Sequence, residues 1–390
     1  MFPFLTKLRK SAARLFLTFG LMGLAAACTP TAGPGPVTGK GGAVTVALLV
    51  PSGSGNASDE ALAVAMQNAA RLAMADLGGV KIDLKVYSTS STEAGAADAA
   101  TRAVAEGAQI ILGPLRSGES NAAAKAVAAN GVNVLSFSNN PSIAGGNLFV
   151  LGTTFQSSAN RLASYAARQG IGKVMIVHDK SASGEAGRVA IQSGIQRAGI
   201  SAVGTGSYEF SQNGIVQAVP ELAKTAKAGG AQAVFLTAES AGALPLVSQL
   251  LRDNGLNPAE VRFIGITRWD VPPQTAALPS LQGGWFALPD PGRMQQFQTR
   301  YAAAYGQPPL ALSELAYDGM AAIGALAGRS NGGPIDAASL TQGAGFAGVA
   351  GVFRLRGDGT NERGLAVAQI QNNQVTVIDP APNSFGGAGF

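Results

Sequence analysis

The sequence contains very few of the residues that build disulfides, metal centres and most catalytic sites. Its 390 residues include one cysteine, Cys28, and one histidine, His178. A single cysteine cannot form an internal disulfide. One imidazole and one thiol also cannot supply the nitrogen and sulfur ligands of a zinc-type centre. We therefore expect a fold without disulfides, and neither a metal nor a cofactor.

Charged and aromatic residues are scarce as well. Charged residues make up 13% of the chain and aromatic residues 6%. The formal net charge is +5, but four of the positive side chains precede Cys28, so the rest of the chain carries +1. Proteins that bind nucleic acid usually present a strongly basic face and aromatic platforms for the bases. The composition therefore argues against nucleic acid as a partner.

Motifs for nucleotide binding and catalysis are incomplete. Gly53-x-Gly55-x-x-Ser58 lacks the third glycine of a dinucleotide-binding loop. His178 stands beside Asp179 at the edge of a predicted strand, where a lone histidine is more often a packing or hydrogen-bonding residue than a catalyst. No pair of carboxylates is marked by a motif. We expect no catalytic residues, and predict that the protein is not an enzyme.

The N-terminus has the features of an export signal. A basic segment over residues 7–14 is followed by an apolar run over 15–24 and by three alanines directly before Cys28. The apolar run is shorter than the roughly 18 residues of a membrane-spanning helix. This order predicts a signal peptide over residues 1–27.

Cys28 resembles the lipidated cysteine of bacterial lipoproteins, although Ala25 stands where leucine is usual and Leu24 lies one residue earlier. A free thiol after cleavage elsewhere is the alternative. Residues 28–43, rich in Thr, Pro, Gly and Ala, predict a flexible tether. Because Thr29 is not an acid, we expect a lipid anchor in the outer membrane rather than the inner one, with the body in the periplasm.

Strand and helix patterns alternate regularly along the body. Residues 44–50 form a continuous apolar run rich in β-branched residues, as expected of a strand covered on both faces. Two such sets in series predict two α/β lobes with mostly parallel sheets. The first set has strands at 44–50, 81–87, 109–112 and 132–135, with helices ending at 78–79 and spanning 93–106 and 118–129. The second has helices at 157–168, 185–198, 214–227 and 241–253, with strands at 173–177, 202–208, 231–236 and 262–266.

The C-terminal third adds two helices and a closing β region. The helices, near 292–305 and 313–327, are expected to return to the first sheet. The β region spans about 351–378, with a turn at 357–359. We assign 44–153 and 287–350 to the first lobe, 154–286 and 351–380 to the second, and 381–390 to a Gly-rich tail.

Several segments, taken in order, resemble the type I periplasmic binding proteins of the leucine/isoleucine/valine type. The resemblance implies two Rossmann-like lobes with parallel central sheets, joined by a multi-strand hinge, that close like a Venus flytrap over a small amino-acid-like or acidic ligand. It also implies amino-acid transport through an ABC permease. The segments are 46–51, Ile110-Ile111-Leu112-Gly113-Pro114-Leu115, 132–141, Val177-His178-Asp179 with Gly184-Glu185, Leu315-Ala316-Tyr317-Asp318-Gly319 and 348–355.

The tether and the stretch Gln282-Gly283-Gly284-Trp285-Phe286-Ala287 are similar to those of the penicillin-binding protein activators. That lipoprotein branch implies a different partner, a peptidoglycan synthase of the cell wall, and a cleft that is vestigial or regulatory. Trp285, Phe286 and the tail at 385–390 would then serve recognition. Ordinary packing is the alternative for the two aromatic residues.

The resemblance places ligand contacts in the first lobe in loops at the carboxyl ends of strands, where α/β proteins bind ligands. The loops over 52–56, 116–120 and 138–140 combine glycine or asparagine with hydroxyl side chains, and the helices that follow favour anions. The candidates for contacts with a ligand carboxylate are Ser117, Ser120, Ser138 and Asn140. Helix capping is the alternative role for each of them.

The second lobe departs from the amino-acid-binding pattern. Ser183 stands where the family usually has an aromatic residue, and the loop after the strand at 231–236 offers Glu239 without a tyrosine. Where the family presents an acid to the ligand ammonium, this chain has Arg268, with Asp270 two residues later. An arginine attracts a carboxylate or phosphate. We therefore expect an acidic ligand, a peptidoglycan fragment or no small ligand.

Overall fold

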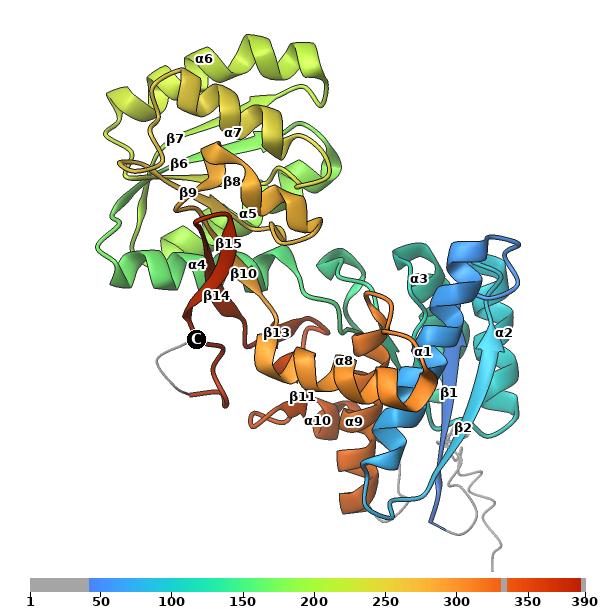
Figure 1. Cartoon of the computed structure of the whole chain (residues 1–390). Coiled ribbons are helices and arrows are strands. Elements are labelled where there is room, and N and C mark those ends of the chain that lie inside the picture. The colour runs from blue at the N-terminus through green and yellow to red at the C-terminus, as the bar shows by residue number, and fades with distance from the viewer. Residues whose placement is uncertain (1–41, 331–334, 387–390) are drawn as a thin grey trace, which may run out of the picture. The chain divides into compact units, whose positions relative to one another are not determined.

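The computed structural model describes residues 42–330 and 335–386 of the chain (Figure 1). The predicted signal peptide, the lipidation site Cys28, nearly all of the predicted tether and the last four residues of the predicted tail lie outside the described residues. Among the described helices, none combines the length and hydropathy needed to cross a membrane.

The first sheet has five parallel strands in the order β2-β1-β3-β4-β5. All seven residues of β1 are buried, in agreement with the continuous apolar run of its sequence. The strands are β1 (Val44–Val50), β2 (Ile82–Ser88), β3 (Ile110–Leu112), β4 (Asn133–Ser136) and β5 (Leu148–Val150).

Helices cover both faces of this sheet. Val46 and Leu48 pack on one face with residues of α1 and α9, and Ala47 and Leu49 pack on the other with residues of α2 and α3. Late in the chain, α8 and α9 join the first core, which confirms that the chain returns to this sheet. The helices are α1 (Ala57–Ala75), α2 (Glu93–Ala105), α3 (Ser117–Val127), α8 (Pro291–Tyr305) and α9 (Ser313–Ser330).

The second sheet has seven strands in the order β15-β14-β10-β9-β8-β6-β7. The five strands from β7 to β10 are parallel, and the β14–β15 hairpin is added antiparallel to β10. The strands are β6 (Lys173–Asp179), β7 (Ser201–Tyr208), β8 (Ala233–Leu236), β9 (Arg262–Gly265), β10 (Trp285–Leu288), β14 (Ala366–Gln371) and β15 (Gln374–Asp379).

Two pairs of helices enclose the second sheet (Figure 1). Residues of α6 and α7 pack on one face, and residues of α4 and α5 on the other. The four helices are α4 (Phe155–Arg168), α5 (Ala182–Arg197), α6 (Gln212–Ala228) and α7 (Leu244–Asp253). Parallel sheets with helices on both faces, in two lobes, confirm the predicted α/β fold class.

A small third sheet corrects one part of the predicted lobe boundaries. It consists of β11 (Phe346–Gly348), β12 (Gly351–Leu355) and β13 (Asn361–Arg363), and a short helix, α10 (Ala337–Leu340), precedes it. Because β12 pairs with β11 and β13 and not with the second sheet, Phe353 and Leu355 pack in the first core, although they were expected in the second lobe. The other boundaries stay predictions.

Polar side chains of β13 bind the segment that leaves β5. Asn361 Nδ2 donates to the carbonyls of Val150 and Gly152, at 2.9 and 2.8 Å. Arg363 Nε donates to the carbonyl of Leu151 at 2.8 Å, and Arg363 Nη1 lies 2.8 Å from Asp318 Oδ2. These bonds hold the residues on the C-terminal side of β5, several of which line the pocket described below.

Candidate functional site

A pocket of about 600 Å³ lies where the loops after β3 and β4 meet the first turn of α9. Because α3 begins directly after β3, the N-terminus of α3 also opens into it. Residues after β9 and at the end of β10 complete the lining. The lining residues are Leu115, Arg116, Ser117, Phe137, Ser138, Asn139, Gly152, Thr153, Phe155, Ser158, Ile266, Thr267, Arg268, Ala287, Leu288, Pro289, Leu312, Glu314, Leu315 and Leu365.

Ser117 and Ser138, two of the candidate ligand contacts, both line this pocket. Their hydroxyl oxygens lie 3.0 Å apart. Ser117 is the first residue of α3, and no side chain caps that helix terminus. Uncapped N–H groups and the helix dipole favour an anionic group at this position. The geometry therefore suits a ligand carboxylate at Ser117 and Ser138.

Ser120 and Asn140 do not line the pocket. Ser120 is fully buried, and its hydroxyl bonds to the carbonyl of Arg116 at 2.8 Å and to Ser136 Oγ at 2.7 Å. Asn140 Oδ1 accepts the N–H of Ser142 at 3.0 Å and so caps a short 3-10 helix. Both side chains have the capping or local hydrogen-bonding role that the sequence left open as the alternative.

Arg268 lines the pocket, but its charge is already compensated. Its Nε donates to Asp270 Oδ1 at 2.6 Å, and its Nη2 bonds to the other oxygen of the same carboxylate. A bidentate pair of this kind leaves little net charge for a ligand. The argument that Arg268 favours an acidic ligand therefore loses much of its force. The sequence placed both residues in one loop but could not show that they bind each other.

Ser183 and Glu239 lie elsewhere. Ser183 is exposed in the first turn of α5, and Glu239 is exposed in the loop after β8. Neither lines the pocket. Their predicted role as ligand contacts has no support from this arrangement.

The walls of the pocket are largely apolar. Phe137 is buried in the first core, and Leu115 and Leu315 pack against or within the same core. Ile266 and Leu365 belong to a core of the second sheet. Because apolar walls with a few placed polar groups are typical of small-molecule sites, the pocket suits a ligand with an apolar side chain and a polar head.

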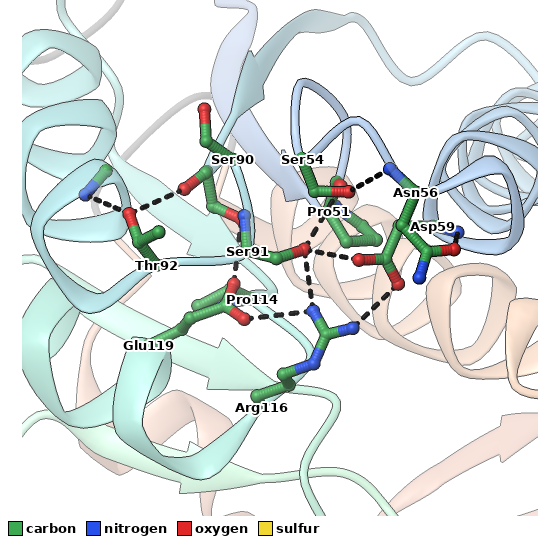
Figure 2. Close-up of polar contacts among 12 residues, drawn as sticks. Pro51, Ser54, Asn56, Asp59, Ser90, Ser91, Thr92, Pro114, Arg116 and Glu119 are labelled. Carbon is green, nitrogen blue, oxygen red and sulfur yellow. Dashed lines mark hydrogen bonds and ion pairs between the residues drawn. The ribbon is translucent and has the colours of Figure 1, made fainter.

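Arg116 joins three loops at the rim of the pocket (Figure 2). Its Nη2 donates to Asp59 Oδ1 at 2.6 Å, and its Nη1 donates to Ser91 Oγ at 2.7 Å and lies 3.2 Å from Glu119 Oε1. Ser91 in turn donates to Asp59 Oδ2 at 2.7 Å. The network fixes the loops after β1, β2 and β3 to one another. Within it, the charge of Arg116 is compensated by Asp59 and Glu119.

We expect Arg116→Met to lower the free energy of unfolding by about 1–2 kcal/mol, because it leaves the buried carboxylate of Glu119 without its cation. Chemical denaturation of the variant measures this loss. Arg116→Lys keeps the charge but cannot bridge three loops, so we expect its free energy of unfolding to lie between those of Arg116→Met and the parent protein. Equal stability of Arg116→Met and the parent protein would show that the network contributes nothing.

The same network predicts a dependence on pH. The hydrogen bond from Ser91, followed by those from Arg116 and Ser54, holds the pKa of Asp59 below its usual value. A lowered folded-state pKa gives stability that is present above the unfolded-state pKa of about 3.9 and is lost as the pH falls through the folded-state value. We expect Asp59→Asn to narrow the difference in stability between pH 7 and pH 3 relative to the parent protein.

Glu314 also lines the pocket, although no motif in the sequence marks it as a site residue. It lies in the first turn of α9, directly before the Leu315–Gly319 segment that carried the resemblance. Burial raises the pKa of its carboxyl group. The only available signal was an acid close to that segment, and nothing in the local pattern shows that such an acid faces a pocket.

His178 takes no part in the pocket. It is buried in β6, where its Nδ1 lies 2.9 Å from the carbonyl of Asp179. In the described part of the chain, no cluster of three or more His, Cys, Asp or Glu side chains is suited to a metal ion.

Comparison with known proteins identifies the family. The model of a family described as "Periplasmic binding protein" matches residues 43–374. A search of curated proteins found no match.

Solved structures with the same fold come from several bacteria. A protein described as a branched-chain amino acid ABC transporter from Rhodospirillum rubrum has a TM-score of 0.72 at 20% identity, covering 86% of this chain and 100% of that one. An ABC transporter substrate-binding protein from Desulfitobacterium hafniense in complex with Leu has a TM-score of 0.64 at 21% identity, over 86% and 100% of the two chains. A solute-binding protein from R. palustris in complex with benzoate has a TM-score of 0.56 at 18% identity, over 88% and 98%.

Sequence identities of this size show a common fold and no more. The family model, in contrast, spans most of the body, from β1 to the start of β15. The chain therefore belongs to the periplasmic binding protein family, in the type I, leucine/isoleucine/valine-binding branch that the sequence predicted.

Proposed function

We propose that the protein is a non-catalytic receptor that binds a small amino-acid-like solute and delivers it to an ABC permease. The observation that carries the proposal is the pair of hydroxyls of Ser117 and Ser138, 3.0 Å apart at the uncapped start of α3 within a pocket of about 600 Å³. A carboxylate at this position gains hydrogen bonds and a favourable helix dipole. The apolar walls would hold the side chain of the solute, and the two lobes would close over it.

Relatives of known ligand guide the choice of probes. One similar structure is described as a complex with Leu and another as a complex with benzoate. A thermal-shift screen of the purified protein should therefore include amino acids, aromatic acids and cell-wall fragments. A ligand at a hundredfold excess over its Kd stabilises the folded state by about 2.7 kcal/mol. A shift with one small solute supports a receptor, and no shift with any of them contradicts it.

We expect Ser138→Ala and Ser117→Ala each to weaken binding of a carboxylate ligand by about 10-fold or more, because each removes a hydrogen bond to a charged group. Isothermal titration calorimetry measures the effect. Ser142→Ala, an exposed serine outside the pocket, is the matched control and should bind as the parent protein does. Unchanged affinity in both pocket variants would place the carboxylate elsewhere.

The synthase-docking alternative has less support from the structure. Trp285 and Phe286, which would have served recognition, are buried in β10, where Trp285 packs against Tyr165 with ring centroids 4.9 Å apart. They are packing residues in the described part of the chain. A pull-down with a peptidoglycan synthase in the absence of any solute effect would revive this alternative. Periplasmic location follows from the family, and lipid attachment at Cys28 stays a prediction.

A further inference from the structure

Another pocket, of about 470 Å³, lies at the opposite end of β9 and β10 from the pocket of Ser117 and Ser138. It is lined by Arg262, the first residue of β9, by Gly283, which precedes β10, and by Gln371, the last residue of β14. The two linings share no residue. Because α/β proteins bind their solutes at the carboxyl ends of parallel strands, a pocket at the amino ends is not part of the solute site.

Arg262 is a half-buried cation without an acidic partner. No ion pair joins it to an acid in the described part of the chain, in contrast to Arg116, Arg268 and Arg363. Burial lowers the pKa of Arg262; Tyr165 counteracts this in part, and no described acid does so. Because charged groups that are taken out of water are usually paired, an unpaired guanidinium in a pocket wall suits an incoming anion.

The stretch from Gln282 to Trp285 holds this guanidinium in place. Arg262 Nη1 donates a hydrogen bond to the carbonyl of Gly283, and the guanidinium lies 5.0 Å from the ring centroid of Trp285. Gly283 has a φ of +81°, and a β-carbon there would lie 2.5 Å from Arg262 Nη1, so the arginine needs a glycine at this position. Arg262 Nε and Nη2 form no hydrogen bond with a described group. The cation is therefore fixed before a ligand binds, with donors left over, which reduces the entropy cost of recognition.

Side-chain amides lie around this cation. Gln371 and Asn372 are exposed where β14 turns into β15, and their side chains form no hydrogen bond with a described residue. A side-chain amide both donates and accepts hydrogen bonds, and so suits the hydroxyl groups of a ligand. Arg252 adds a second positive charge, and Asp253, which lies 3.4 Å from it, is not part of the lining. Among the described residues, the lining therefore has two arginines and no acid.

We propose that this pocket binds an acidic sugar, with its carboxylate or phosphate group at Arg262 and its hydroxyl groups at Gln371 and Asn372. A guanidinium can pair with two oxygens of either oxyanion. The apolar side chains of the lining are small, two prolines and one alanine, so an apolar ligand has little to bind here. The volume of the pocket exceeds that of an inorganic ion and lies in the range of small-molecule sites. The proposal does not depend on the proposed function of the solute pocket.

Matched sugars test the proposal on the purified protein. Glucuronate has a carboxylate where glucose has a hydroxymethyl group, glucose 6-phosphate carries a phosphate on the same ring, and inorganic phosphate is the bare oxyanion. Tryptophan fluorescence reports binding, because Trp285, one of two tryptophans in the chain, lies against Arg262, and titration calorimetry confirms each affinity. We expect at least one acidic sugar to bind about 10-fold or more tightly than glucose and inorganic phosphate. The acidic sugar that binds more tightly identifies the oxyanion.

Two substitutions assign this binding to the pocket. Arg262→Gln removes the cation and should reduce the affinity for the acidic sugar to that for glucose. Gln371→Glu places a negative charge in the pocket wall at an exposed position, where it should not disturb the fold, and should weaken binding by about 10-fold or more. Gln217→Glu, the same change at an exposed position of α6 outside the pocket, is the matched control and should bind as the parent protein does.

Four results would overturn the inference. Equal affinities for glucose and both acidic sugars would show that the pocket recognises no charge, and equal affinities for inorganic phosphate and the acidic sugars would show that it recognises no sugar. An acidic sugar that binds Gln371→Glu as tightly as the parent protein would lie elsewhere. Failure of every sugar to bind would exclude the site. None of these results affects the solute pocket, which Ser117→Ala and Ser138→Ala test separately.

Discussion

Arg363→Met is expected to lower the free energy of unfolding by about 3–5 kcal/mol, because it leaves the carboxylate of Asp318 buried without its cation. The two side chains are almost fully enclosed, with exposed fractions of 1% for Arg363 and 0% for Asp318. Asp318 Oδ1 also accepts the N–H of Val349 at 2.7 Å, so the carboxylate is held in place when the arginine is removed. It cannot move to water, and the cost of its desolvation remains.

The arginine has more than an electrostatic role. Its Nε donates to the carbonyl of Leu151, and its guanidinium lies 4.8 Å from the ring centroid of Phe353. Methionine fills part of the volume but provides neither the hydrogen bond nor the charge. The segment after β5 should therefore become less ordered, and the pocket residues Gly152 and Thr153 lie in that segment.

Equilibrium denaturation with guanidinium chloride measures the loss, and a double-mutant cycle assigns it. Asp318→Asn combined with Arg363→Met removes both charges, so the pair should lose clearly less stability than the sum of the single losses. Lys224→Met is the matched control, because Lys224 forms an ion pair in which both side chains are largely exposed. It should change stability by no more than about 0.5 kcal/mol. Additive losses in the cycle would show that the two groups do not depend on each other.

The strands show which parts of the fold were predictable from the sequence. Several central strands, such as β1, β3 and β8, are buried apolar runs with helices between them, and this alternation can be seen in the local pattern alone. The strands that the sequence did not identify, β5, β10 and β11, are three or four residues long. A run of three apolar residues has no period of its own, and it becomes a strand only because a neighbouring strand presents an edge. The place of β12 beside β11 and β13 likewise depends on which edge it meets.

The candidate site was predictable only in part, for a related reason. Ser117 and Ser138 follow strands, and the carboxyl ends of adjacent parallel strands must lie side by side. The charge state of the pocket depends instead on pairs of side chains. Arg268 forms an ion pair with Asp270, whereas Glu314 forms no ion pair with a described residue. No spacing in the sequence shows that Arg268 is bound to Asp270, so the expectation of an acidic ligand did not take this pair into account, and it stays a prediction.

Trp269→Ala is the second substitution with a large expected effect, a loss of about 3–5 kcal/mol in the free energy of unfolding. Trp269 stands between Arg268 and Asp270 in the loop after β9, and the structure buries it completely in the core of the second sheet. A β-carbon at Gly265 would overlap the indole ring, and one at Gly284 would lie 2.7 Å from it. The backbone at both glycines is therefore already in close contact with the indole ring. Because it has no side chain there that could move in, we expect the cavity that alanine creates to stay unfilled.

The loss should come from packing and not from a polar contact. The indole Nε1 is buried without a hydrogen-bond partner in the described part of the chain, so Trp269→Phe removes an unsatisfied donor along with part of the ring. We expect the loss in free energy of unfolding to be less than half as large in Trp269→Phe as in Trp269→Ala, as measured by denaturation of both variants. Phe210→Ala, which truncates an aromatic residue that is 67% exposed, should change stability little. Since Trp269 stands between Arg268 and Asp270, the alanine variant should also weaken ligand binding at temperatures where it is still folded. A variant with normal stability would show that the core of the second sheet can close around the missing ring.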